Sequence, residues 1–158
     1  MGSRNKYEMD HESGQIRLDR TLFTSTRYPA DYGFIEGTLG EDGDPLDCLV
    51  LVQEPTFPGC VISGRPIGVL RMRDEKGADA KIVAVPTGDV RNKLAEMAEV
   101  PEYIVLEIRH FFEVYKDLEP GKSSEVGGWE GAAAAEREIE DSRRRYQEAS
   151  EAGGSKRP

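Results

Sequence analysis

Three carboxylates lie within six residues at Asp42-Gly43-Asp44-Pro45-Leu46-Asp47, immediately before the apolar run Cys48-Leu49-Val50-Leu51-Val52. The glycine and the proline predict a tight, stiff turn, and the apolar run predicts a buried strand. Anions this close repel one another, so either some of them take up protons or a cation holds them together. A rigid turn that opens a core strand is well placed to present oxygen ligands, which favours the cation.

Strand signals broken by glycine and proline continue on both sides of this stretch, from Gln15 to Pro86. Alternating or apolar residues predict strands over residues 15–20, 47–52, 61–62, 67–72 and 80–85. Several short strands with frequent turns are typical of a small barrel or a compact twisted sheet.

Beyond Pro86 the apolar residues recur at helical spacing, and Asp89 can cap the first of the expected helices. The expected helices cover residues 90–99, 102–116 and 129–150, so that Trp129 opens the last one. The expected fold class is therefore mainly β with helices (α+β). A single domain is expected over residues 1–150, followed by a disordered tail over residues 151–158.

Composition excludes several classes of function. The 158 residues suffice for one domain with a core, and their formal net charge is −9. An acidic chain is a poor partner for nucleic acids and for anionic membranes. No apolar stretch approaches the ~20 residues of a membrane-spanning helix, and no signal peptide is recognisable. The spacing of Cys48 and Cys60 does not match a metal site, so reduced thiols in a cytoplasmic protein are expected, with a disulfide as the alternative.

A second acidic group follows at Asp74-Glu75 and Asp79. Asp79 and Lys81 stand two residues apart at the start of an expected strand, so they share one face. If Asp74 and Asp79 face the first group, the site holds five carboxylates, and all-oxygen ligation selects a hard cation such as Mg²⁺. The alternative is an acidic surface turn. An EF-hand is rejected, because the sixth position of such a loop would be Asp47 rather than glycine.

Cationic and phenolic side chains are the other conspicuous set. Lys6, Arg20, Lys81 and Lys116 each neighbour an aromatic residue or a carboxylate. Taken singly, each is more often part of a surface ion pair. Together with tyrosine hydroxyls they form a set of donors for phosphate oxygens. Carboxylates for several metal ions plus cationic phosphate donors are what a phosphoryl-transfer site needs.

These motifs resemble the family I soluble inorganic pyrophosphatases of the prokaryotic type, over nearly the whole chain up to about Lys122. The motifs that carry the resemblance are Lys6-Tyr7-Glu8, Asp19-Arg20, residues 28–34, Asp42 to Asp47, Asp74-Glu75 with Asp79 and Lys81, and residues 110–117. The resemblance implies a five-stranded barrel of the oligonucleotide-binding (OB) type with two outer helices. It also implies Mg²⁺-dependent hydrolysis of pyrophosphate to two phosphates, with several Mg²⁺ per active site, and commonly a homohexamer.

The resemblance also implies roles for individual residues. Metal ligation is implied for Glu8, Asp42, Asp47, Asp74 and Asp79. Contacts with phosphate oxygens are implied for Lys6, Arg20, Tyr32, Lys81, Tyr115 and Lys116, with Tyr28 in support. Asp44 is expected to accept the proton of the attacking water, because a carboxylate already bound to metal, such as Asp79, is a poorer base. The substrate is expected to arrive as a magnesium complex, which reconciles an anionic substrate with an acidic protein.

One departure keeps an alternative open. The family usually has a further strand with another glutamate before the Lys-Tyr-Glu motif, and only five residues precede Lys6 here. An inactive or weakly active assembly subunit is therefore the alternative function. Two other classes are weaker. A nucleic-acid-binding barrel would need a basic groove, and a nucleotide diphosphate hydrolase would need a glutamate-rich helix.

Overall fold

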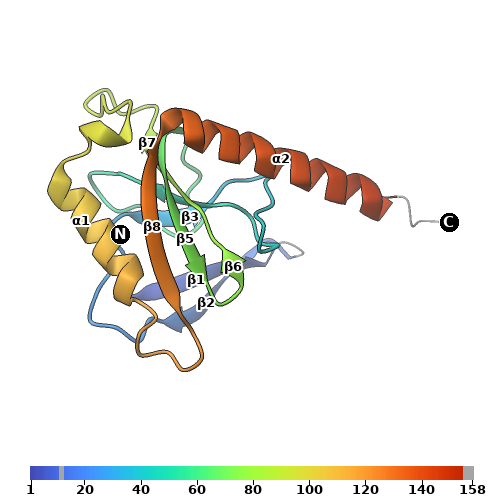
Figure 1. The fold of residues 1–158 in the computed structure, drawn as a ribbon, viewed down its shortest axis with the longest axis horizontal. Helices are drawn as coiled ribbons and strands as arrows, with labels where there is room; N and C mark the ends of the chain where they lie inside the picture. Colours follow the sequence, from blue (N-terminus) through green and yellow to red (C-terminus); the bar gives the residue numbers. More distant parts are fainter. Residues whose placement is uncertain (11–12, 155–158) are drawn as a thin grey trace.

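The computed structural model describes residues 1–10 and 13–154. Strands β1 (Asn5–Asp10) and β2 (Gln15–Thr21) form an antiparallel hairpin in which each pairs with the other. The remaining strands form a six-stranded mixed sheet in the order β3-β4-β7-β5-β6, with β8 paired to β5 (Figure 1). The strands of this sheet are β3 (Asp31–Phe34), β4 (Asp47–Val50), β5 (Gly64–Asp74), β6 (Gly77–Ala78), β7 (Lys81–Pro86) and β8 (Ser124–Gly131).

Strands β4 and β7 are parallel and lie inside the sheet, with Asp47 opposite Lys81 in their register. Parallel strands are covered on both faces and read as continuous apolar runs. That is the pattern of both segments, and Leu49, Ile82 and Val83 are fully buried. The first residues of both strands are polar, so this end of the pair presents charged side chains while the rest anchors them in the core.

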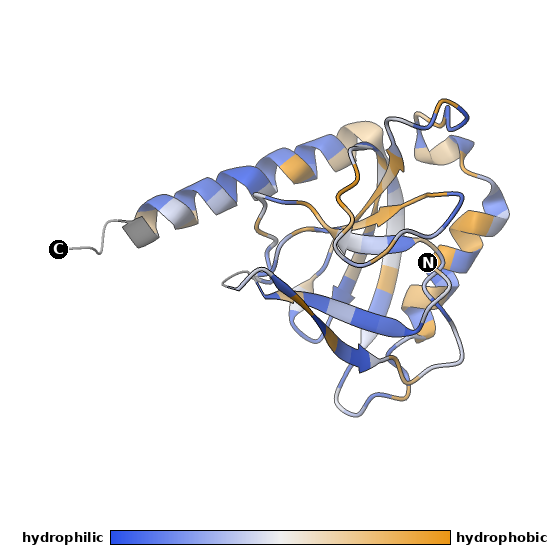
Figure 2. Ribbon diagram, turned by 180° about the vertical axis from the view of Figure 1, so that it is seen from behind, coloured by the Kyte–Doolittle hydropathy of each residue, from blue (hydrophilic) through white to orange (hydrophobic). Residues whose placement is uncertain are grey.

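The sheet carries an apolar core on each face. One core joins Leu49, Leu70 and Val83 to Ile108 and Phe111 of helix α1 (Glu102–Val114). The other joins alternate residues of the same strands, including Cys48 and Ile82, to the first half of helix α2 (Ala132–Gly154). Figure 2 shows that the polar far end of α2 extends beyond the body of the protein.

The structure confirms the α+β class and the two outer helices, and the eight strands of the described residues exceed the expected five. Residues 61–62 lie outside the strands, and β3 forms where no strand was expected. Helix α1 ends at Val114, two residues before its expected end. Helix α2 includes residues 151–154 of the expected tail, and residues 155–158 lie outside the described part of the chain.

The helix expected over residues 90–99 is wrong, because only the single 3₁₀ turn Met97–Glu99 forms there. The Asp89 carboxylate accepts a hydrogen bond from the Arg91 N–H at 3.0 Å, as a capping residue would. The Leu94 carbonyl, however, accepts one from the Arg65 side chain at 2.7 Å. That carbonyl therefore bonds a side chain at the start of β5 instead of a helical N–H.

Trp129 lies in β8, so its expected place in a helix is also wrong. It pairs with Leu70 of β5, and Val126 pairs with Met72, with a register shift between the two pairs. That irregularity separates the two apolar residues by three positions, which is also a helical spacing. The helix begins only at Ala132.

Two smaller expectations can also be compared with the structure. Cys48 and Cys60 are both free thiols, Cys48 buried and Cys60 partly exposed. Within the described residues no helix is long and apolar enough to cross a membrane.

Candidate active site

All twelve residues that the sequence assigned to the site line one cavity of about 290 Å³. The hairpin contributes Lys6, Glu8 and Arg20, and the segment after α1 contributes Tyr115 and Lys116. The sheet and its loops contribute Tyr32, Asp42, Asp44, Asp47, Asp74, Asp79 and Lys81. The two acidic stretches therefore meet at one place, as the argument from the sequence required.

A buried lysine occupies the centre of the acidic group. Lys81 Nζ donates to Asp79 Oδ1 at 2.6 Å and also to Asp47 Oδ2, and the Tyr32 hydroxyl donates to the same Asp47 oxygen at 2.5 Å. Burial alone would lower the pKa of Lys81, but the Asp47 and Asp79 carboxylates raise it well above its usual value. The ammonium group therefore stays charged, and its contacts offset the penalty for burying that charge.

The ionised form of the Asp79 carboxylate is disfavoured by its surroundings. Burial raises its pKa, and the negative charges of Asp47 and Asp74 add to this effect, while Lys81 opposes it. A raised pKa means that the ionised form is disfavoured in this environment. A divalent cation bound between these carboxylates would remove that penalty.

Lys116 holds the second acidic stretch. Its Nζ donates to Asp74 Oδ2 and to Glu75 Oε2, each at 3.0 Å. Burial would raise the pKa of Asp74, but Lys116 and two backbone N–H groups of the following turn lower it. Asp74 is therefore an ionised carboxylate, fixed in place at the end of β5.

Asp44, like Glu8, is largely open to solvent. Its Oδ2 accepts a hydrogen bond from Lys76 Nζ at 2.6 Å, and the side chains are 59% and 56% exposed. An ion pair this exposed is weak. Its backbone N–H donates to Asp42 Oδ1 at 3.1 Å, and Gly43 has φ +88°, so the turn between them is tight. Asp44 thus projects from a turn of fixed shape and can exchange partners readily.

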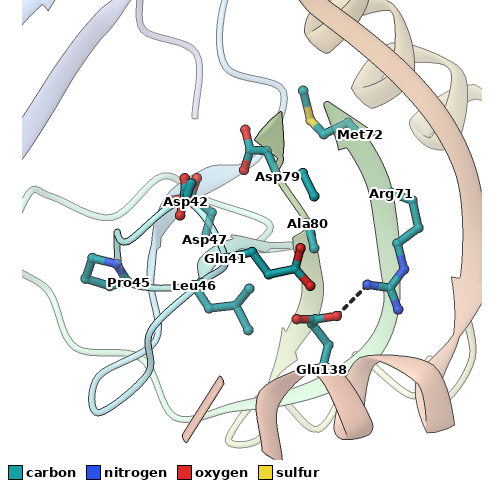
Figure 3. Close-up of a pocket in the computed structure, with 12 residues that line it drawn as sticks. Glu41, Asp42, Pro45, Leu46, Asp47, Arg71, Met72, Asp79, Ala80 and Glu138 are labelled. Atoms are coloured by element: carbon teal, nitrogen blue, oxygen red, sulfur yellow. Dashed lines mark hydrogen bonds and ion pairs between the residues drawn. The ribbon is translucent and has the colours of Figure 1, made fainter. Parts of the chain in front are cut away.

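A smaller cavity of about 60 Å³ adjoins the main one, and Asp42, Asp47 and Asp79 line both. Figure 3 shows its far wall, where Arg71 of β5 meets Glu138 of α2. Arg71 Nη1 donates to Glu138 Oε2 at 2.5 Å, and Arg145 Nη2 donates to the other oxygen at 3.1 Å. The Arg71–Glu138 pair thereby links α2 to β5 beside the acidic residues.

The donor set fits a hard divalent cation. Five carboxylates line the main cavity as proposed ligands, and carboxylate oxygens are what Mg²⁺ prefers. Among the described residues, no three acidic, histidine or cysteine side chains converge closely enough to hold an ion. Lysine ammonium groups neutralise the carboxylates instead, from Lys6, Lys76, Lys81 and Lys116. The proposed ligands therefore line one cavity, with lysine ammonium groups as their present partners.

The cavity also includes charged residues to which the sequence analysis gave no role: Asp19, Glu75, Lys76 and Lys122. Asp19 and Glu75 are adjacent to assigned residues, so their position in the sequence was a usable signal. Lys76 and Lys122 each stand beside a glycine in a turn, Gly77 and Gly121, both with positive φ. A lysine in a turn is usually a solvated residue, and only the fold reveals which turns meet.

Comparisons with known proteins show the family of this chain. A family model described as inorganic pyrophosphatase matches residues 1–147. The inorganic pyrophosphatase of Streptomyces coelicolor is 62% identical over 148 residues, covering 93% of this chain and 91% of the relative. The crystal structure of the Thermus thermophilus inorganic pyrophosphatase superposes with a TM-score of 0.89 at 49% identity, covering 92% of this chain and 86% of the other. The chain therefore belongs to the inorganic pyrophosphatase family.

Proposed function

We propose that this protein is an inorganic diphosphatase, which uses Mg²⁺ and water to split pyrophosphate into two phosphates. The observation that carries the proposal is the single cavity in which eight carboxylates, six cations and three tyrosines meet from separate parts of the chain. A phosphoanhydride between two anionic groups needs charge neutralisation on both sides of the bond that breaks. This cavity contains groups of the required kinds.

The cations and phenols hold the substrate. Lys6, Arg20, Lys81 and Lys116 donate charge-assisted hydrogen bonds to phosphate oxygens and stabilise the charge that develops on the leaving phosphate. Burial raises the pKa of Tyr115, so its hydroxyl keeps its proton and serves as a donor. Tyr32 is a second donor, with Asp47 as its present acceptor.

The carboxylates hold the metal. Glu8, Asp42, Asp47, Asp74 and Asp79 are the proposed ligands. Mg²⁺ held there would neutralise phosphate oxygens and make the attacking water more acidic. Asp47 and Asp79 are proposed metal ligands, and both also bond Lys81, a proposed phosphate-binding residue. Metal binding and substrate binding are therefore coupled through the same two carboxylates.

Asp44 accepts the proton of the attacking water. It is the solvent-open carboxylate beside the proposed ligands, with a weak lysine contact that it can release. An Asp44→Asn variant should lose about 10²–10⁴-fold in turnover, the usual contribution of a general base, while Mg²⁺ still binds. Glu36→Gln, an exposed acid in the preceding loop, is the matched control. Turnover close to wild type in Asp44→Asn would remove this assignment.

Phosphate release from pyrophosphate and from ATP, each with Mg²⁺ and with EDTA, tests the function directly. Pyrophosphate should be the faster substrate, and EDTA should abolish its turnover. Faster release from ATP would point to a nucleotide hydrolase. No release from either substrate would favour the alternative, an inactive assembly subunit.

The remaining features are proposed from the family. They are a homohexamer in the cytoplasm, one domain over residues 1–150, and no nucleic-acid or membrane partner. Tyr103 and Leu106 on α1 are 65% and 56% exposed, which supports a surface that a second chain covers. Light scattering during gel filtration should give the mass of six chains, and a monomer mass would contradict the assembly.

A further inference from the structure

The hairpin carries four residues of the cavity, yet its strands pair with each other and not with the main sheet. Most of β2 is exposed. Near its start, Ile16 contacts the loop at Gly59, where an added Cβ would approach Ile16 Cδ1 to 2.6 Å. Near its end, Arg20 reaches across to the segment after α1. The position of Arg20 therefore depends on what holds its guanidinium group.

Glu119 holds that group. Arg20 Nε donates to Glu119 Oε1 at 3.0 Å, and the Glu119 side chain is only 10% exposed. The other carboxylate oxygen, Oε2, contacts Lys122 Nζ at 3.0 Å. Burial would raise the pKa of Glu119, but Arg20 and Lys122 lower it, so the carboxylate is ionised at neutral pH. One nearly buried anion thus bonds two cations that line the cavity.

The orientation of Arg20 follows from these contacts. Glu119 uses Nε, and Asp19 accepts a hydrogen bond from Nη1. These two contacts leave Nη2 for a phosphate oxygen. The lining of the main cavity, as far as the described residues define it, includes Arg20, Asp19 and Lys122 but not Glu119. Glu119 therefore lies behind the cations and not among the groups that face the substrate.

The turn that presents Glu119 is itself well defined. The Glu119 N–H donates to the Lys116 carbonyl at 2.9 Å, and the Lys122 N–H donates to the Glu119 carbonyl at 3.2 Å. Lys116 is one of the proposed phosphate-binding residues. The same turn therefore places Lys116 directly and Arg20 through the Glu119 carboxylate.

We propose that Glu119 is a positioning residue for pyrophosphate binding, which fixes the guanidinium group of Arg20 and thereby the hairpin at the rim of the cavity. The inference rests on the proposed function. Without Glu119, the arginine side chain would have to be ordered by the substrate at each binding event, and that ordering weakens binding. The loss should appear mainly in KM, because the cost of ordering Arg20 is met when the substrate binds and is the same in the ground state and the transition state.

The test is Glu119→Gln, which keeps the shape of the side chain and removes its charge. We expect KM for magnesium pyrophosphate to rise by about three- to tenfold, with kcat within about twofold of wild type. Glu119→Asp, which keeps the charge, should recover part of the loss. Glu113→Gln is the matched control, because it breaks the exposed Arg109–Glu113 pair of α1 and should leave KM unchanged.

A double-mutant cycle decides whether the effect passes through Arg20. In an Arg20→Lys background, which lacks the planar fork, Glu119→Gln should change KM by less than about twofold. Affinity for inorganic phosphate, measured by calorimetry, should follow the same pattern. Thermal melting checks folding, and if Glu119→Gln melts far below wild type, Glu119→Asp carries the comparison.

An unchanged KM in Glu119→Gln, or an equal effect in the Arg20→Lys background, would overturn the inference while the proposed function stands. If the wild-type protein releases no phosphate from pyrophosphate, the proposed function and this inference fall together.

Discussion

Lys81 on β7 and Arg20 on β2 line the same cavity, yet the side chain of Lys81 is 3% exposed and that of Arg20 is 26% exposed. Lys81 belongs to a strand with neighbours on both sides and a core on both faces. Arg20 belongs to a two-stranded hairpin, an element that has little stability of its own. The cavity thus has a rigid wall from the sheet and a more adjustable wall from the hairpin.

The two walls are therefore expected to have different roles in metal binding and phosphate binding. Metal coordination tolerates little displacement of its ligands, and four of the five proposed metal ligands come from the sheet and its loops. The hairpin contributes two of the proposed phosphate-binding cations and one proposed metal ligand, Glu8, whose side chain is 56% exposed. Substitutions on the sheet wall should therefore have larger effects than the same substitutions on the hairpin wall.

The largest effect is expected from Asp47→Asn on the sheet wall. Asp47 bonds Lys81 and Tyr32 and is a proposed metal ligand, so its loss disturbs three groups at once. Turnover should fall by more than about 100-fold, and Mg²⁺ affinity should fall with it. Steady-state kinetics over a range of Mg²⁺ concentrations separates the two effects, and an unchanged Mg²⁺ dependence would contradict the assignment as a ligand.

The equivalent change on the hairpin, Glu8→Gln, should be milder. The Glu8 carboxylate is exposed, and the nearby Lys6 ammonium group already neutralises its charge. A fall of about tenfold in kcat/KM is expected, mainly at low Mg²⁺ concentration. If Glu8→Gln were as damaging as Asp47→Asn, the two walls would be equally rigid and the comparison would fail.

Metal binding should stabilise the sheet wall more than the hairpin. At a Mg²⁺ concentration of 100 times its Kd, the melting temperature should rise by about 5–10 °C over the EDTA-treated protein. Asp47→Asn should lose most of this increase, and Glu8→Gln should keep it. Differential scanning calorimetry gives the result, and an increase retained in Asp47→Asn would place the strongest metal site elsewhere.

The smallest expected effect concerns acid stability without metal. The carboxyl groups of Asp74 and Glu119 have pKa values below the usual 3.8 and 4.5. They therefore stabilise the fold above those values, and this stabilisation is lost as the pH falls through the lowered pKa values. Buried Asp79, with a raised pKa, acts in the opposite sense. The melting temperature in EDTA should be level from pH 8 to 6 and fall below pH 4.5. A rise on acidification would mean that Asp79 dominates.

Local patterns in the sequence were sufficient for the elements that bury continuous apolar runs. Strands β4 and β7 and helix α1 are where their composition placed them, and the predicted proximity of Asp79 and Lys81 is confirmed by their hydrogen bond at 2.6 Å. Strands β1, β3, β6 and β8 were missed because none of them carries a continuous apolar run from which a buried strand could be predicted.

For the candidate site, too, the sequence predicted some features and not others. Motifs identified the residues that the cavity gathers, but not which cation meets which anion. The contact between Arg20 and Glu119 spans 99 residues, and that between Lys116 and Asp74 spans 42. Such pairs follow from the way in which the turns assemble, and no spacing in the sequence encodes them.

The contrast between the two thiols has a practical consequence. Burial and the neighbouring Asp47 raise the pKa of Cys48 to about 12, so this thiol resists alkylation in the native protein. Cys60 is partly exposed and follows Gly59, which lies against Ile16 of the hairpin. A maleimide dye would thus label a single site next to the adjustable wall, and its fluorescence would report hairpin movement during turnover without any engineered cysteine.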